Sequence, residues 1–244
     1  MSEAKSGTVK SATRTLDIME YAVAHVGHFT AQDVADTLGI PLSSMSYLLG
    51  TLVDREYLSR DGRRYGRGPA MARLAAGPGS VSPAERARPL VRSIRTKLNE
   101  TTSFFARSGC EAEALVTEAS DQALRYAVSP NSRAPLHALA AGKAILATLE
   151  PEELSAYFRE SRREAMTVNT ITSEKELRKE IEKVRKTGIA RSREEFSPGI
   201  AAVARAMGKD GALSIAIPLA RFDEAIEQRA IDLLAAAAAT FAQG

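Results

Sequence analysis

Residues suited to covalent or metal chemistry are few in this 244-residue chain. It has three histidines, His25, His28 and His137, and one cysteine, Cys110. Two histidines three positions apart could hold a metal ion, and a thiol could act as a nucleophile. Both chemistries need further ligands or a base, and the sequence places no such group beside these residues. We therefore predict no metal, no cofactor and no catalytic residue, with Cys110 as an incidental thiol in a hairpin turn.

Two other patterns resemble catalytic motifs but lack an essential member. His137–Ala144 reads HALAAGKA, whereas a phosphate-binding loop needs glycine at its first position and serine or threonine at its last. Glu194 and Glu195 are adjacent, and adjacent residues of a strand point in opposite directions, so their spacing does not make an acid–base pair. We expect His137 to begin a helix and to satisfy a backbone group.

A different chemistry is suggested by GIPLSSMSYLLGTLVDREYL, residues 39–58. One side carries apolar residues at the i, i+3, i+4, i+7 spacing of a buried helical stripe; these are Met45, Leu48, Leu49, Leu52 and Val53. The other side is small and rich in hydroxyl groups; it consists of Ser43, Ser44, Ser46 and Tyr47. Such a surface can enter the major groove of B-DNA, where short side chains allow close approach and hydroxyls can donate to bases or phosphates.

Positive charge follows this helix directly. Between Leu58 and Leu74 a single acidic residue, Asp61, accompanies five arginines: Arg60, Arg63, Arg64, Arg67 and Arg73. A concentrated basic patch beside a small polar helix face attracts the phosphates of a DNA duplex. We predict DNA contacts from the four hydroxyl-bearing residues named above and from Arg60, Arg63, Arg64 and Arg67.

The elements that must position these residues are three short helices and a hairpin, within residues 8–75. Asp61-Gly62 between two short runs is a strong hairpin signal, and a helix-turn-helix followed by a basic hairpin is a winged helix. The first expected helix runs from Ser11 to Gly27, with Leu16, Met19, Val23 and Val26 facing inward. The second is capped by Thr30 and Asp33 and ends at Gly39. The third begins at Pro41 and is followed by the hairpin.

Residues 76–98 are predicted to be a linker. Gly77, Pro78 and Gly79 should break the preceding helix, and Ser82-Pro83-Ala84-Glu85 should cap a new one with Leu90, Ile94 and Leu98 inward. For residues 99–244, mixed strands and helices favour an α+β or α/β sensor-like domain over a doubly wound sheet. The predicted strands are 103–106, 112–117, 123–128, 200–207 and 212–218, and the predicted helices 138–149, 152–158, 173–187 and 222–242.

Composition limits the setting. The chain is 44% hydrophobic, has a net charge of +3, and has no apolar run near the roughly 20 residues that span a bilayer. Its first residues lack the apolar core of a signal peptide, and one cysteine rules out an intramolecular disulfide. We expect a cytoplasmic protein with no membrane partner.

Nearly the whole chain resembles the IclR-type bacterial transcriptional regulators. The resemblance is carried by VKSATRTLDIMEYAV, by FTAQDVADTLGIPLSSMSYLLGTLVDREYL, by YGRGPAMARLA and, in the second half, by APLHALAAGKAILA, TGIARSREEFSPGIAAVARAM and GALSIAIPLARF. It implies a winged-helix dimer, or a dimer of dimers, whose second domain is similar to GAF and PAS sensors and binds a small organic effector that alters operator binding. It also favours a repressor of a catabolic operon.

The resemblance further implies which residues line the effector pocket: Tyr126, Ala134, Ala140, Ala141, Ser192, Ile200, Ala202, Ser214 and Ala216. Members that sense small carboxylates tend to have acidic, cysteine or serine groups where this chain has Ser192, Ala202 and Ala216. Methyl groups widen a pocket and lower its polarity, so we expect a bulkier, partly apolar effector, such as an aromatic compound.

Three classes of function remain open. The chain could be a ligand-responsive transcription factor, a DNA-binding protein whose second domain only oligomerises, or an enzyme fused to a winged helix. A ligand-dependent change in operator affinity separates the first from the second, and the missing catalytic constellation argues against the third. One recognition helix covers only a few base pairs, so a homodimer on a symmetric site is implied by DNA-binding function.

Overall fold

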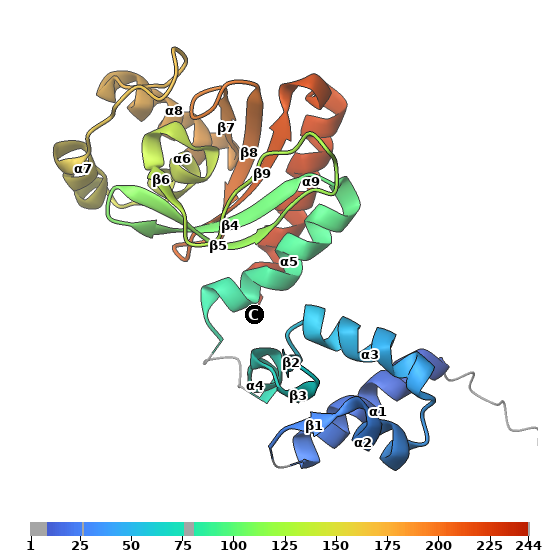
Figure 1. The fold of residues 1–244 in the computed structure, drawn as a ribbon. Helices are drawn as coiled ribbons and strands as arrows, with labels where there is room; N and C mark the ends of the chain where they lie inside the picture. Colours follow the sequence, from blue (N-terminus) through green and yellow to red (C-terminus); the bar gives the residue numbers. More distant parts are fainter. Residues whose placement is uncertain (1–8, 26, 76–80, 244) are drawn as a thin grey trace, which may run out of the picture. The chain divides into compact units, whose positions relative to one another are not determined.

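The computed structural model describes residues 9–25, 27–75 and 81–243, in two compact units, Met1–Val81 and Ser82–Gly244. Figure 1 shows the elements of both units, coloured along the sequence. Four residues named in the sequence predictions, Val26, Gly77, Pro78 and Gly79, lie outside the described ranges. None of the described helices has the length and hydrophobicity needed to cross a lipid bilayer.

The first unit is a winged helix, as predicted. Its elements are α1 (Lys10–Ala24), β1 (Phe29–Thr30), α2 (Ala31–Leu38), α3 (Leu42–Asp54), β2 (Leu58–Asp61), β3 (Arg64–Arg67) and α4 (Pro69–Ala75). The strands form an antiparallel sheet in the order β1-β3-β2. Thr30 and Asp33 make the predicted capping box at the start of α2, and Gly39 ends it in the left-handed conformation that glycine adopts without steric cost.

The predicted inward face of α1 is wrong at Leu16 and Val23, whereas Met19 packs against the core as predicted. Leu16 and Val23 are each 58% exposed, whereas Ile18 and Ala22 are buried. The apolar surface of α1 is broader than the narrow stripe that contacts α2 and α3, so the helix turns a different edge of that surface toward the core. Leu16 and Val23 instead line an exposed groove that Leu74 of α4 also borders.

The second unit contains one six-stranded sheet in the order β6-β5-β4-β9-β8-β7, with every pair antiparallel. In chain order the elements are α5 (Pro83–Leu98), β4 (Thr101–Ser108), β5 (Glu111–Glu118), β6 (Arg133–Pro135), α6 (Ala140–Ala147), α7 (Pro151–Glu160), α8 (Glu174–Thr187), β7 (Ala190–Arg193), β8 (Ile200–Ala206), β9 (Ala212–Pro218) and α9 (Glu224–Phe241), with short 3₁₀ turns at 136–138 and 219–221.

Helices cover the two faces of this sheet, each over its own apolar core (Figure 1). On one face α5 and α9 pack on Phe104, Leu213 and Ile215. On the other, α6, α7 and α8 pack around Phe105 and Ala114. Because successive residues of a strand point to opposite faces, adjacent Phe104 and Phe105 belong to different cores.

Two sequence predictions for this unit need correction, and one strand was missed. Residues 123–128 form no strand; the edge strand is Arg133–Pro135, which pairs with β5. The strand β7 was not predicted, because four residues with two arginines carry little apolar signal. The helix predicted to be a linker belongs to the second unit, since Ala87, Val91 and Ile94 of α5 are buried in its core.

Gly142 on α6 provides a test of this packing. A Cβ atom there would overlap the backbone of Leu136, which cannot move aside as a side chain can. We expect Gly142→Ala to lower the free energy of unfolding of the second unit by about 1–3 kcal/mol, the usual cost of overpacking. Urea denaturation followed by circular dichroism measures it.

Gly50 on α3 is the matched control, because a Cβ atom there meets nothing within 4 Å. Gly50→Ala should raise the stability of the first unit by about 0.5–1 kcal/mol through helix propensity. Equal tolerance of alanine at both positions would contradict the close approach of α6 to residue 136.

Candidate functional site

The exposed face of α3 has the predicted surface. Tyr47 is 81% exposed, Ser43 and Ser46 are also exposed, and Ser44 is half-buried. On the opposite side Met45, Leu49 and Leu52 are buried in the core of the first unit, as expected, while Leu48 and Val53 are half-buried.

The β2–β3 hairpin presents three of its arginines differently from the fourth. Arg63, Arg64 and Arg67 are exposed. Arg60 is also exposed, but its Nε donates to the carbonyl of Gly62 at 2.9 Å, and its guanidinium carbon lies 5.7 Å from the centre of the Tyr65 ring. Arg60 therefore braces the turn.

A second candidate site lies on the α6 face of the large sheet. Cross-strand pairing aligns Thr101 of β4 with Ala216 of β9, Ala216 with Ala202 of β8, and Ala202 with Ser192 of β7. These four small side chains form one row across four strands, and all four line a cavity. A neighbouring pair, Ser103 and Ser214, extends the lining. Small residues in register leave open the space that larger ones would fill.

The cavity has about 490 Å³ of empty space, including its opening to solvent. Eight of the nine effector-pocket residues implied by the resemblance line it: Tyr126, Ala140, Ala141, Ser192, Ile200, Ala202, Ser214 and Ala216. Ala134 does not; it is buried on β6 and borders an adjoining hollow that shares Phe105 and Phe196 with the cavity. Lining residues that the sequence reasoning missed are Thr101, Ser103, Phe105, Val128, Leu139, Phe196 and Ser197.

The lining is apolar with a few hydroxyl groups. Among the described residues that line the cavity, none carries a charged side chain. Ser103 is satisfied by Thr117 at 2.9 Å, and Ser192 reaches the carbonyl of Ala138 only at 3.4 Å. Ser214 is 7% exposed, and within the described part of the chain its hydroxyl has no hydrogen-bond partner. A hydroxyl in the cavity lining that has no protein partner is available to hydrogen-bond a ligand.

The N-terminus of α6 also meets this cavity. The helix begins at Ala140 after Leu139, which provides no side-chain cap, and Ala140 and Ala141 line the cavity. The first N–H groups of a helix lack intrahelical partners and favour an electronegative group. The cavity thus has mostly apolar walls and, at Ala140 and Ala141, is bordered by the first turn of a helix.

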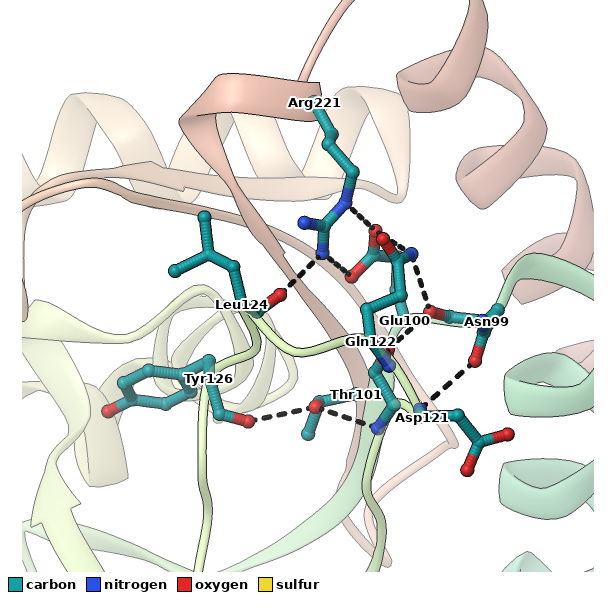
Figure 2. A network of polar contacts seen from close by, with 9 residues as sticks. Asn99, Glu100, Thr101, Asp121, Gln122, Leu124, Tyr126 and Arg221 are labelled. Atoms are coloured by element: carbon teal, nitrogen blue, oxygen red, sulfur yellow. Dashed lines mark hydrogen bonds and ion pairs between the residues drawn. The ribbon is translucent and has the colours of Figure 1, made fainter.

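A network of polar contacts fixes the cavity wall that Tyr126 provides (Figure 2). Thr101 donates to the carbonyl of Tyr126 at 2.8 Å and accepts from the backbone N–H of Ser120. Beside it, Arg221 makes two bonds to the carboxylate of Glu100, at 2.8 and 2.9 Å, and a third to the carbonyl of Leu124.

This network explains why residues 119–128 are ordered without being a strand. Glu100 is 1% exposed, and Gln122 donates to its carboxylate and to the carbonyl of Asn99. Side chains here supply the hydrogen bonds that a neighbouring strand would otherwise provide. Because Asn99 ends α5, the network also joins this cavity wall to the end of that helix.

A second ion pair holds another part of the cavity wall. Lys143 of α6 is 1% exposed and bonds both carboxylate oxygens of Glu195, at 2.7 and 2.9 Å. Burial raises the pKa of Glu195, and the ammonium group opposes that shift. Glu195 follows β7 in a turn rather than lying on a strand, and it precedes Phe196 and Ser197, which line the cavity. The pair therefore fixes this turn against α6.

The remaining titratable candidates are structural. His137 lies in the 3₁₀ turn before α6, and its Nε2 is 2.9 Å from the carbonyl of Glu164, as expected for a histidine that satisfies a backbone group. Burial lowers the pKa of His137. Cys110 lies in the β4–β5 turn, where burial raises the pKa of its thiol and makes it a weaker nucleophile.

Known proteins share both parts of this chain. Residues 80–242 match the family model for the bacterial transcriptional regulator IclR C-terminal domain, and residues 11–62 match the IclR helix-turn-helix domain. The HTH-type transcriptional regulator Rv1719 of Mycobacterium tuberculosis is 29% identical over 226 residues, which cover 90% of this chain and 86% of that protein.

Solved structures are similar over nearly the full length. The transcriptional regulator RHA06195 of Rhodococcus sp. RHA1 is 25% identical with a TM-score of 0.66, and the match covers 97% of each chain. An IclR homologue from Microbacterium hydrocarbonoxydans, complexed with 4-hydroxybenzoate, has the same fold, with 20% identity, a TM-score of 0.58, and 95% of this chain and 97% of that one covered. The chain belongs to the IclR family of bacterial transcriptional regulators, with a DNA-binding winged helix and a GAF/PAS-like C-terminal domain.

Proposed function

We propose that this regulator binds a partly apolar, aromatic small molecule in the cavity of its second unit and that this binding changes its affinity for operator DNA. The observation that carries the proposal is the cavity itself: its described lining is mostly apolar and carries no charged side chain, and it includes the Ser214 hydroxyl, which has no hydrogen-bond partner within the described part of the chain. Regulators of this family are generally not enzymes, and an enzymatic function has no supporting constellation in the sequence.

On the DNA side, α3 lies in the major groove with Ser43, Ser46 and Tyr47 toward the duplex. The hairpin arginines Arg63, Arg64 and Arg67 bind backbone phosphates or enter the minor groove, which supplies affinity more than sequence choice. Arg60 contributes by holding the turn that presents them.

The apolar walls of the cavity favour an effector with an aromatic ring. The N-terminus of α6 favours an acid or hydroxyl group on that effector. Phe105, Leu139 and Phe196 offer apolar area, worth about 25 cal/mol per Å² buried. The free N-terminus of α6 and Ser214 offer donors for one or two polar groups of the ligand. That the Microbacterium homologue is complexed with 4-hydroxybenzoate supports this class of ligand.

The proposed regulator works as a homodimer. The groove bordered by Leu16, Val23 and Leu74 leaves three large apolar side chains between 58% and 65% exposed, and a second copy would remove them from water. Two recognition helices then read a symmetric operator, where the bound dimer blocks transcription.

An effector changes operator binding only if it prefers one state of the regulator over the other. The walls held by Arg221–Glu100 and Lys143–Glu195 are the parts a ligand would contact, and the first of these joins the end of α5. If the second unit serves only for oligomerisation, no ligand changes operator affinity, and that measurement distinguishes the two functions.

The wing arginines should set the salt dependence of DNA binding. In R64Q/R67Q we expect the slope of log Kobs against log[salt] to fall by about 0.9 for each phosphate that the variant no longer neutralises. Affinity should drop similarly on specific and non-specific duplexes, as measured by fluorescence anisotropy. The matched control is R159Q/R162Q, which removes two exposed arginines from the second unit. Equal slopes for both double variants would exclude the hairpin from DNA binding.

Filling the cavity should weaken ligand binding without affecting DNA binding. Ala202 lies in the middle of the cross-strand row, so Ala202→Leu places a larger side chain in the cavity. We expect calorimetry to show at least about tenfold weaker binding of 4-hydroxybenzoate, in line with the cost of a misfitted pocket, and unchanged affinity for DNA.

Ala225→Leu on the exposed side of α9 is the control and should leave both affinities intact. The panel for the unaltered protein includes benzoate, 4-hydroxybenzoate and pyruvate. Tight binding of pyruvate alone, with no aromatic ligand bound, would contradict the aromatic effector.

A further inference from the structure

We infer that α3 selects its operator by contacting thymine methyl groups in the major groove, so that A·T pairs specify the bases it touches. The inference rests on the proposed DNA-binding function and adds the class of base that is read. It follows from which side chains α3 has, and from which of them are exposed.

The side chains that read guanine and adenine are missing from α3. Arginine or lysine normally binds guanine O6 and N7, and asparagine or glutamine binds adenine N6 and N7. The sequence of α3, LSSMSYLLGTLVD, contains none of these four residues and no histidine. Its one acidic residue, Asp54, could accept from cytosine, but it ends the helix, about 18 Å along the axis from Leu42. Recognition helices contact bases mainly with their N-terminal residues.

What α3 does expose near its N-terminus is apolar or hydroxyl-bearing. Leu42 is 50% exposed and Tyr47 is 81% exposed, in contrast to Met45 and Leu49, which have no exposed surface. Ser43 and Ser46 lie beside them on the same face. One turn further along, Gly50 has open space where a Cβ would be, so the helix backbone can approach a duplex closely there.

These groups discriminate between bases in one way. Serine hydroxyls can pair with several base edges and select weakly, whereas an apolar side chain gains only where the major groove has an apolar group, the C5-methyl of thymine. Leu42 and the ring of Tyr47 are the large apolar groups on this face. The minor groove adds to the same preference, because A-tracts narrow it and attract arginines such as those of the hairpin.

The test begins with the full chain and a random duplex library. Duplexes recovered by selection are resynthesised with deoxyuridine in place of thymidine at single positions, which removes the methyl group and preserves base pairing. We expect one or two positions per half-site at which the substitution weakens binding about fourfold, the equivalent of one buried methyl group.

Leu42→Ala, combined with the deoxyuridine substitutions, identifies the thymine methyl group that Leu42 contacts, because the two losses of affinity should not add at that position. It should weaken binding of the thymidine duplex and abolish the further loss caused by deoxyuridine at its own position. Because Leu42 is half exposed, its truncation leaves no cavity in the core. Leu124→Ala is the matched control, a leucine 59% exposed in the second unit, and it should leave the deoxyuridine effect intact. Tyr47→Phe should likewise retain sensitivity to deoxyuridine, whereas Tyr47→Ala should lose it at the position that the ring contacts.

Three results would overturn the inference. Selected duplexes in which G·C pairs are required at the contacted positions would show another mode of reading. If deoxyuridine at every position left binding as tight as with thymidine, contacts to methyl groups would be excluded, although the protein would still bind DNA. Recovery of no duplex at all would remove the proposed DNA-binding function together with this inference.

Discussion

The second unit depends on the register of four antiparallel strands. Pairing places Thr101, Ala216, Ala202 and Ser192 in one row, and side-chain alternation turns that whole row to the α6 face. A shift of one residue in any strand would send its member to the α5–α9 face and bring a core residue such as Ile215 into the cavity. The same register therefore makes a continuous core on one side of the sheet and an open space on the other.

Among the described residues, the charged side chains near the cavity do not line it; they form ion pairs that hold its walls. Lys143–Glu195 joins the turn at 194–197 to α6, and Arg221, which binds the buried Glu100, also donates to the carbonyl of Leu124; each carboxylate accepts hydrogen bonds through both of its oxygens. A buried ion pair contributes little net stability, because desolvation offsets the attraction, but loss of one partner is costly. These pairs hold residues 122–126 and 194–197 in place while leaving the cavity lining neutral.

Local signals in the sequence predicted the first unit well. The capping box at Thr30, the left-handed Gly39 and the Asp61-Gly62 turn each act within a few residues, so the elements followed from them. The buried face of α1 could not be predicted in the same way, because a broad apolar surface allows more than one edge to be buried.

In the second unit, Thr101, Ser103 and Phe196 were missed at the cavity because they converge through strand pairing and a buried ion pair between distant residues. One signal for Ser103 and Thr101 was available in the sequence. Side chains two residues apart on a strand share a face, so in a strand that enters a hairpin at Cys110, Phe105, Ser103 and Thr101 point the same way. The edge strand was misplaced because hydrogen bonds from Thr101, Gln122 and Arg221 hold residues 119–128 in an irregular path that propensity cannot reveal.

The placement of α5 has a consequence for recombining such regulators. Its apolar side, through Ala87, Val91 and Ile94, forms part of the core beneath β4 and β5, and its last turn runs into the buried Glu100. A sensor transplanted without this helix would lose a piece of its own interior and expose the sheet beneath. The boundary for exchanging DNA-binding domains between relatives thus lies before Ser82. A chimera joined there keeps α5 with the effector domain.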